Sequence, residues 1–128
     1  MIVRNLKDVE QTPHFVNYGN GTSHRLLTSA DGMGFTVCHT VVKAGTESHL
    51  QYVNHLESCY CIAGAGEIET AAGQIYPIEV GTLYALNEHD RHYMRANSGA
   101  DMVLVSVFSP AFSGTEIHNL SSESASGY

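Results

Sequence analysis

A chain of 128 residues, 43% of them hydrophobic, is long enough for one domain with one closed core. Its 13 acidic residues against six Lys and Arg give a formal net charge of -7, which opposes binding to nucleic acid. The first residues lack the apolar core of a secretory signal, and no stretch approaches the ~18 apolar residues of a membrane span. We therefore expect a cytoplasmic protein with no nucleic-acid or membrane partner, whose three cysteines are buried thiols.

Strand-like segments dominate the chain. The clearest helical candidate is a short turn at residues 7–12, which Pro13 would end. Runs rich in Val, Ile, Tyr and Thr follow at residues 34–43, 57–62, 67–70, 74–78, 82–86, 92–95 and 102–108. Their number and even spacing predict an all-β sandwich or barrel. Residues 119–128 are serine-rich with little to bury, which predicts a flexible tail after a folded domain of residues 1–118, or a tail that becomes ordered only when a ligand is present.

The middle of the chain resembles the two metal-site motifs of the cupins, a family of small jelly-roll β-barrels. The positions that fit this frame are Gly45, Glu57, Gly64 and Gly81. Gln51 and Val53 stand where cupins usually carry two His ligands, and Tyr84 stands where the second motif carries another. The resemblance therefore implies a single-domain cupin, an all-β jelly-roll barrel with one or two short helices. Its metal, if it holds one, needs a more oxygen-rich ligand set.

Three residues are candidate metal ligands. Glu57 points into the barrel if the cupin register holds, and a buried carboxylate needs a cation or hydrogen-bond donors. Tyr84 occupies a ligand position of the frame, and His92 follows at an even offset after a turn. Carboxylate, phenolate and imidazole suit a first-row ion such as Fe(II), with other divalent first-row metals as alternatives. Taken singly, each residue fits an ordinary core or surface role; the coincidence of Glu57 and Tyr84 with two ligand positions favours a site.

Three further side chains are candidates for chemistry near Glu57. His55 titrates near neutrality and could carry a proton, and Tyr52 could donate to a polarised oxygen. A packed Tyr-His pair at a subunit contact is the alternative for both. Arg25 could hold a substrate carboxylate through two hydrogen bonds, although most lone arginines are solvated. The other histidines lack ligand spacing with one another, and we interpret most of them as surface residues.

Beyond the cupin frame, nine short segments distributed over most of the chain form a recognisable set. They are MIVRNL at 1–6, RLL at 25–27, DGMGF at 31–35, AGTE at 44–47, HLE at 55–57, YCI at 60–62, GTLYAL at 81–86, HDRH at 89–92 and GTEIH at 114–118. In these segments the chain resembles the ectoine synthases. The family cyclises N-γ-acetyl-L-2,4-diaminobutyrate with loss of water to give L-ectoine. The resemblance thus implies an iron-dependent hydro-lyase of compatible-solute biosynthesis, active as a homodimer.

The resemblance also implies roles for individual residues. Catalytic iron would be held by Glu57, Tyr84 and His92. The substrate contacts would be Arg25, Thr40, Tyr52, His55, Leu86, Asp90, Phe108 and Glu116. Arg25 would bind the α-carboxylate, and Glu116 or Asp90 would orient the ammonium group. We expect the catalytic acid to be Tyr52 or His55, with Glu57 completing the catalytic set.

The sequence departs from the family pattern in places that keep other hypotheses open. It has no Trp, whereas family members usually carry one shortly before the Arg25 segment, and it becomes serine-rich after His118. One alternative is a non-catalytic cupin that binds a small molecule. Another is an enzyme that keeps the metal and the barrel but acts on a related amide or amidine.

Overall fold

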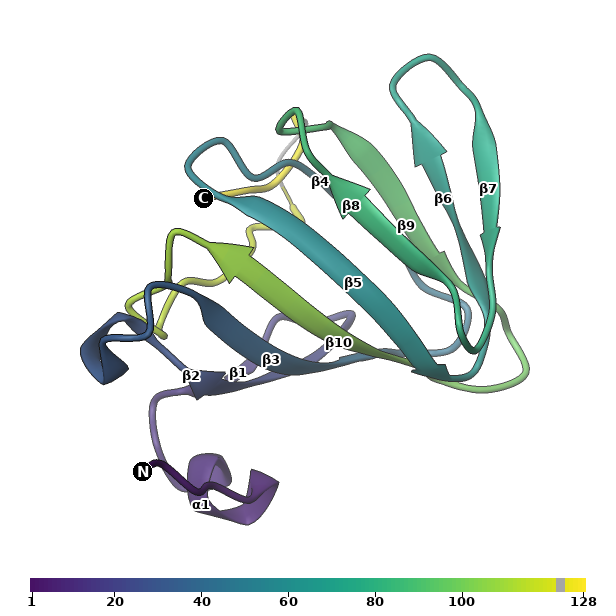
Figure 1. Cartoon of the computed structure of the whole chain (residues 1–128). Coiled ribbons are helices and arrows are strands. Elements are labelled where there is room, and N and C mark those ends of the chain that lie inside the picture. The colour runs from purple at the N-terminus through teal and green to yellow at the C-terminus, as the bar shows by residue number, and fades with distance from the viewer. Residues whose placement is uncertain (122–123) are drawn as a thin grey trace.

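The computed structural model describes residues 1–121 and 124–128 and forms two antiparallel sheets that face each other (Figure 1). The elements are α1 (Leu6–Glu10), β1 (Phe15–Asn17), β2 (Gly21–Leu27), the 3₁₀ helix η1 (Ser29–Asp31), β3 (Thr36–Val42), β4 (Glu47–Leu50), β5 (Leu56–Ala63), β6 (Gly66–Thr70), β7 (Ile75–Ile78), β8 (Leu83–Leu86), β9 (His92–Ala96) and β10 (Met102–Ser109). Sheet A has the order β1-β2-β3-β10-β5-β8, and sheet B has the order β4-β9-β6-β7. This confirms the predicted all-β fold with one or two short helices.

Local sequence explains where the elements begin and turn. Asn5 caps α1, because its side chain accepts from the Lys7 backbone N–H at 3.1 Å while Asp8 accepts from the Asn5 backbone N–H at 2.7 Å. Gly64 turns the chain between β5 and β6 with φ of 72°. A Cβ there would collide with the carbonyl oxygen of Asp101, so the turn requires glycine.

Alternation along the strands directs one set of side chains between the sheets. These side chains form a buried hydrophobic cluster that consists of Val42, Leu50, Cys59, Cys61, Ile68, Ile78, Met94, Ala96, Met102 and Leu104. All three cysteines are free and buried, as predicted. No helix in the described residues is long and apolar enough to cross a membrane.

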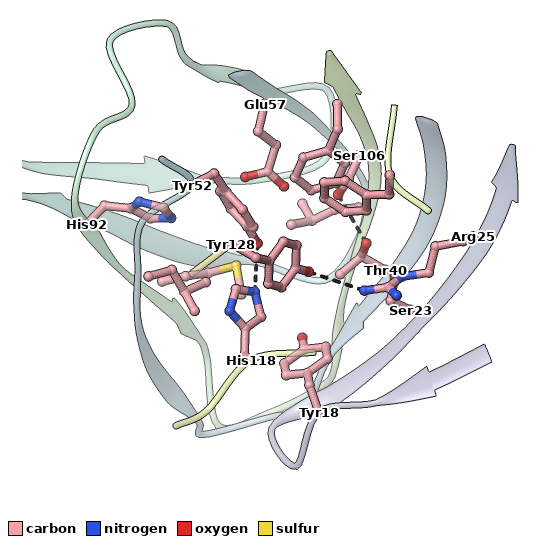
Figure 2. Close-up of a pocket in the computed structure, with 15 residues that line it drawn as sticks. Tyr18, Ser23, Arg25, Thr40, Tyr52, Glu57, His92, Ser106, His118 and Tyr128 are labelled. Atoms are coloured by element: carbon pink, nitrogen blue, oxygen red, sulfur yellow. Dashed lines mark hydrogen bonds between the residues drawn. The ribbon is translucent and has the colours of Figure 1, made fainter. Parts of the chain in front are cut away.

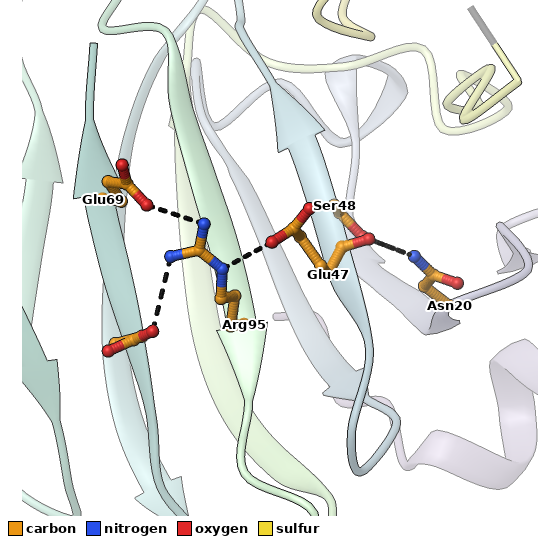
Figure 3. A network of polar contacts seen from close by, with 6 residues as sticks. Asn20, Glu47, Ser48, Glu69 and Arg95 are labelled. Carbon is orange, nitrogen blue, oxygen red and sulfur yellow. Dashed lines mark hydrogen bonds and ion pairs between the residues drawn. The ribbon is translucent and has the colours of Figure 1, made fainter. Parts of the chain in front are cut away.

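Strand β9 is held from outside the sandwich by one arginine (Figure 3). Arg95 reaches Glu47 on β4 at 2.6 Å, and Glu67 and Glu69 on β6 at 3.3 and 2.6 Å. A network of this kind ties neighbouring strands more effectively than an isolated surface pair does. Arg95 therefore fixes the strand whose opposite face carries His92.

The described part of the predicted tail lies against the barrel. Ser126 forms a parallel bridge with Leu50, accepts from the Gln51 backbone N–H at 2.9 Å and donates its own to the His49 carbonyl at 2.8 Å. A Cβ at Gly127 would collide with the Gln51 carbonyl, so this approach is close. Whether the segment moves stays a prediction; its described residues pack as a strap beside β4.

Candidate active site

A small cavity lies between the two sheets, walled mainly by aromatic and polar side chains (Figure 2). Its lining residues are Tyr18, Ser23, Arg25, Thr40, Leu50, Tyr52, Glu57, His92, Met94, Leu104, Ser106, Phe108, Phe112, His118 and Tyr128. The free volume is about 30 Å³, enough for one or two waters. In this arrangement the protein's own side chains therefore fill the space that a larger ligand would need.

One end of the cavity, which we call the ligand end, is lined by Glu57 and His92, and the third predicted metal ligand, Tyr84, lines a neighbouring hollow that His92 also borders. Glu57 is 8% exposed, and burial raises the pKa of its carboxyl to about 7, partly opposed by the Cys59 thiol that donates to Oε1 at 3.1 Å. Tyr84 lies two residues before Leu86 on β8 and is paired with Cys59 on β5. Its hydroxyl donates to a soft acceptor, the Met94 sulfur, at 3.7 Å and also interacts with the Cys59 thiol.

His92 has the arrangement of a metal-binding imidazole. Its Nδ1 lies 2.9 Å from the backbone carbonyl oxygen of Asp90, so Nδ1 carries the proton and Nε2 carries a lone pair. The residue is 2% exposed, and Nε2 has no hydrogen-bond partner among the described residues. Burial lowers the pKa of His92, which keeps the ring neutral. A carbonyl fixing the far nitrogen is the usual support of a ligating His.

These donors fit a first-row divalent ion. A buried lone pair without a partner is costly, and a cation would satisfy it. The same cation would stabilise the ionised forms of Glu57 and Tyr84, whose pKa values burial now raises. Within the described residues, no group of three His, Cys, Asp or Glu converges.

The opposite side of the cavity, which we call the arginine end, centres on Arg25. This residue is 3% exposed, and its guanidinium donates to Ser23 Oγ at 2.9 Å, the Gly114 carbonyl at 3.0 Å and the Tyr128 hydroxyl at 3.2 Å. All three acceptors are uncharged. Among residues 1–121 and 124–128, no carboxylate forms an ion pair with Arg25. A buried cation without an anion is strongly disfavoured, so this end is suited to receive one.

Aromatic rings enclose the arginine end. The Tyr128 ring packs against Tyr52 at 5.3 Å, Phe112 at 5.1 Å and His118 at 4.8 Å between ring centres. Burial raises the pKa of the Tyr128 hydroxyl, which stays protonated. Tyr128 thus occupies the position beside Arg25 that an anionic ligand would take.

His118 lines the pocket and belongs to the histidines without ligand spacing, most of which the sequence interpretation placed on the surface. Its Nε2 lies 2.8 Å from the Tyr52 hydroxyl, and its Nδ1 lies 3.3 Å from Ser126 Oγ. Burial, then the charge of Arg25, lowers the pKa of His118 to about 4, so a neutral ring accepts from Tyr52. No ligand spacing marks His118 in the sequence; contacts from distant segments bring it into the pocket.

The remaining predicted contacts divide between the cavity wall and its surroundings. Thr40, Tyr52 and Phe108 line the cavity. Leu86 and Asp90 instead line a neighbouring open hollow of about 460 Å³, together with Tyr84 and His92. His92 therefore borders both spaces.

His55 and Glu116 lie outside the cavity wall. His55 Nδ1 lies 2.7 Å from the Pro110 carbonyl, and its ring packs edge-on against Phe112 at 4.5 Å. The Glu116 carboxylate accepts from the Ser113 and Gly114 backbone N–H groups at 2.9 and 2.8 Å. Glu116 therefore shapes the turn whose Gly114 carbonyl binds Arg25.

Comparison with known proteins is decisive for the family. The family model described as ectoine synthase matches residues 1–125. An L-ectoine synthase from Halalkalibacterium halodurans is 49% identical over 120 residues, covering 93% of this chain and 92% of the relative. The chain belongs to the ectoine synthase family.

Solved structures agree with this membership. The crystal structure of ectoine synthase from P. lautus matches with a TM-score of 0.85 and 45% identity, covering 91% of this chain and 83% of the other. A cupin-2 domain protein from Rhodospirillum rubrum matches with a TM-score of 0.61 at 18% identity, covering 78% of this chain and 64% of the other, which supports the cupin fold alone. The family match ends at residue 125, so Tyr128 lies outside it.

Proposed function

We propose that this chain is an L-ectoine synthase, a hydro-lyase that cyclises N-γ-acetyl-L-2,4-diaminobutyrate. In this reaction the α-amino nitrogen bonds to the acetyl carbonyl carbon, and the carbonyl oxygen leaves as water. The observation that carries the proposal is a buried Arg25, with uncharged partners, in the same pocket as Glu57 and the unpaired His92 Nε2. The substrate has a carboxylate that can pair with Arg25, and it has an amide oxygen that can reach the ligand end with Glu57 and His92.

Glu57, Tyr84 and His92 would hold the metal, which we propose to be Fe(II) or another divalent first-row ion. Once bound, such an ion supplies Lewis-acid polarisation of the amide oxygen, a contribution of several kcal/mol. The support is the donor set itself: a buried carboxylate, a phenol and an imidazole nitrogen without another partner. Oxygen and nitrogen donors of this kind suit first-row ions.

The two ends of the pocket would bend the substrate for ring closure. Arg25 binds the α-carboxylate in place of the Tyr128 hydroxyl, and a guanidinium holds a carboxylate through two parallel hydrogen bonds. With the carboxylate held there and the acetyl group at the ligand end, the amine and carbonyl are brought together. Orientation of this kind removes much of the entropic part of the barrier. Phe108 and Phe112 keep water from the space between the ends.

Tyr52 is the better placed of the two predicted acids. Its hydroxyl faces the cavity, and burial raises its pKa well above the usual value, so it holds its proton at neutral pH. In the structure that proton is donated to His118 Nε2, so the hydroxyl must turn from His118 toward the departing oxygen in order to protonate it. His55 is bound to the Pro110 carbonyl behind Phe112. We assign protonation of the departing oxygen to Tyr52 and a supporting position to His55.

The test is cyclisation of N-γ-acetyl-L-2,4-diaminobutyrate by metal-stripped protein with and without added Fe(II). Wild type is assayed beside Glu57→Ala and Tyr84→Ala. Iron-dependent ectoine formation that both variants lose supports the synthase and its ligand set together. Absence of product from wild type with every first-row metal would refute the proposal.

The cavity gives one observation in favour of a non-catalytic binding protein. Tyr128 already occupies the place beside Arg25, and only about 30 Å³ remains free. A decayed or sensory cupin would bind the substrate or ectoine in calorimetry without converting it. Turnover in the assay above excludes this alternative.

We also propose a cytoplasmic homodimer. Free thiols at all three cysteines suit a reducing compartment. The outer face of sheet A exposes Leu56, Tyr60, Ile62 and Leu83 at 41–61%, and an apolar patch of this kind often marks an interface. Light scattering coupled to size exclusion gives the test: Tyr60→Lys should convert a dimer to a monomer, whereas a wild-type monomer contradicts the proposal.

A further inference from the structure

A row of four polar side chains crosses the inner face of sheet A from β5 to β3. The Cys59 sulfur lies 3.1 Å from Glu57 Oε1 and 3.3 Å from Ser106 Oγ, and Ser106 Oγ lies 3.1 Å from Thr40 Oγ1. Strand β10 lies between β3 and β5 and places Ser106 directly opposite Cys59. Cys59 and Ser106 are each 1% exposed, so bulk water does not compete for these bonds. The row joins a proposed metal ligand to a proposed substrate contact.

Counting protons fixes the direction of every bond in the row. A thiol and a hydroxyl each have one proton to donate. The Cys59 thiol donates its proton to Glu57 Oε1 at 3.1 Å. Ser106 must then donate to the Cys59 sulfur, and Thr40 must donate to Ser106. With its single proton committed, Thr40 presents only lone pairs to the cavity.

We propose that Cys59 and Ser106 are positioning residues that orient the Glu57 carboxylate and lock Thr40 as a hydrogen-bond acceptor for a substrate N–H. The inference rests on the proposed function and adds two residues to its machinery. It also assigns polarity: Thr40 receives a proton donor, such as the amide or amino nitrogen, rather than a carbonyl or carboxylate oxygen. Charge-assisted bonds to the carboxylate make the Glu57 end the stronger one.

The first test is the affinity of metal-stripped protein for Fe(II) alone, measured by anaerobic calorimetry. Loss of an outer partner of a metal ligand typically costs roughly 10- to 100-fold in affinity. Cys59→Ala should therefore weaken Fe(II) binding by about 10-fold or more, and Cys59→Ser, which keeps one donor, should restore most of it. Cys61→Ala is the matched control, because this thiol is buried on the same strand but bonds to the Ala63 carbonyl. Equal affinity of the Cys59→Ala and Cys59→Ser proteins would overturn the proposal.

The second test is a spectroscopic one that does not depend on turnover. The S–H stretch of Cys59 is isolated by subtracting the infrared spectrum of Fe(II)-loaded Cys59→Ser from that of wild type. A donating thiol absorbs at lower frequency than a free one, and Ser106→Ala should move the band because it removes the hydroxyl that polarises the sulfur. An unshifted S–H band in Ser106→Ala would refute the hydrogen bond from Ser106 to Cys59 and with it the proposal.

The third test links Ser106 to Thr40 through kinetics. Thr40→Val and Ser106→Ala should each raise KM more than they lower kcat. Their effects should not add in the double variant, because Ser106 acts on the substrate only through the Thr40 hydroxyl, which Thr40→Val has already removed. Additive effects contradict the lock on Thr40. If wild type forms no ectoine, the proposed function fails, while iron affinity and the S–H band still decide the role of Cys59. Failure of wild type to bind Fe(II) overturns both.

Discussion

The ligand end and the arginine end of the pocket differ in how far the protein satisfies its own polar groups. At the ligand end, His92 Nε2 has no partner within the described residues, and Glu57 accepts from a weak thiol donor. At the arginine end, the guanidinium of Arg25 has three protein acceptors, including Tyr128. On the proposed function, a cation would complete the first end, whereas an anion would have to replace a protein group at the second.

This difference separates two costs of substrate binding. Adding a metal to the ligand end removes an existing penalty, since an unpaired buried group costs about 1–3 kcal/mol. Binding a carboxylate at the arginine end first breaks a hydrogen bond and displaces an aromatic ring from Phe112 and His118. We therefore expect changes at the ligand end to alter kcat and metal affinity, and changes at the arginine end to alter KM.

The largest effect should come from removing the unpaired imidazole. His92→Ala should abolish Fe(II) binding and lower kcat by about 10³-fold or more, because Lewis-acid polarisation contributes several kcal/mol. Calorimetry with Fe(II) and a progress curve for ectoine measure the two quantities. His49→Ala is the control, because this histidine stacks on Tyr93 at 4.2 Å on the neighbouring strand, away from the cavity. Wild-type iron affinity in His92→Ala would remove His92 from the ligand set.

The next effect in size belongs to Arg25. Arg25→Lys keeps the charge but loses the paired donors, and truncating a buried charge contact costs about 2–5 kcal/mol, so kcat/KM should fall on the order of 10²-fold. Steady-state kinetics should place most of this loss in KM, and iron affinity should not change. Arg4→Lys provides a control, since Arg4 binds Asp31 on the outer surface at 2.7 Å. A loss confined to kcat would move Arg25 from binding to chemistry.

The strands predicted from sequence include β5, β9 and β10, although these line the cavity through Glu57, His92 and Ser106. Residues 102–108 were identified because both faces carry Val, Leu and Met. Strands β1, β2 and β4 were missed. On β2 the inward positions are Ser23 and Arg25, which face the cavity and break the apolar alternation. Polar cavity residues thus obscured the pattern of β2 but not that of β5, β9 and β10.

The candidate site was predictable where a ligand position has fixed spacing. Glu57 and Tyr84 were found from the cupin frame, and His92 from its offset beyond a turn. His118 and Tyr128 enter the pocket through long-range packing, which no local pattern encodes. The Cys59 row was equally hidden, because a Cys and a Ser on separate strands meet only through register. The proposed metal and substrate roles stay predictions until they are measured.

The third prediction concerns His118, whose neutral ring lies near the Arg25 cation, and the pH dependence of the free energy of unfolding measures its protonation. The pKa of His118 is lowered from 6.5 to about 4, so between these values the unfolded chain binds a proton that the folded protein does not. The free energy of unfolding should therefore fall as pH decreases from 6.5 toward 4, by roughly 3 kcal/mol at most from this residue. Urea unfolding of metal-free wild type and His118→Gln measures the difference between them.

The comparison of two proteins is needed because Glu57 acts in the opposite direction. Its pKa is raised from 4.5 to about 7, so the folded protein binds the extra proton in that interval and gains stability as pH falls. This contribution is common to wild type and His118→Gln and cancels in the difference. Parallel pH curves for the two proteins would show that His118 titrates normally.

The smallest expected effect concerns the Tyr128 hydroxyl. Tyr128→Phe keeps the ring contacts with Tyr52 and Phe112 but removes the acceptor that competes for Arg25 at 3.2 Å. One hydrogen bond contributes about 0.5–1.5 kcal/mol, so KM should decrease about two- to tenfold while kcat changes little. A rise in KM would mean that the hydroxyl binds the substrate instead of standing in for it. Tyr76→Phe is the control, because it removes an exposed hydroxyl on β7. The direction of the change in KM therefore decides whether the substrate carboxylate replaces the Tyr128 hydroxyl at Arg25.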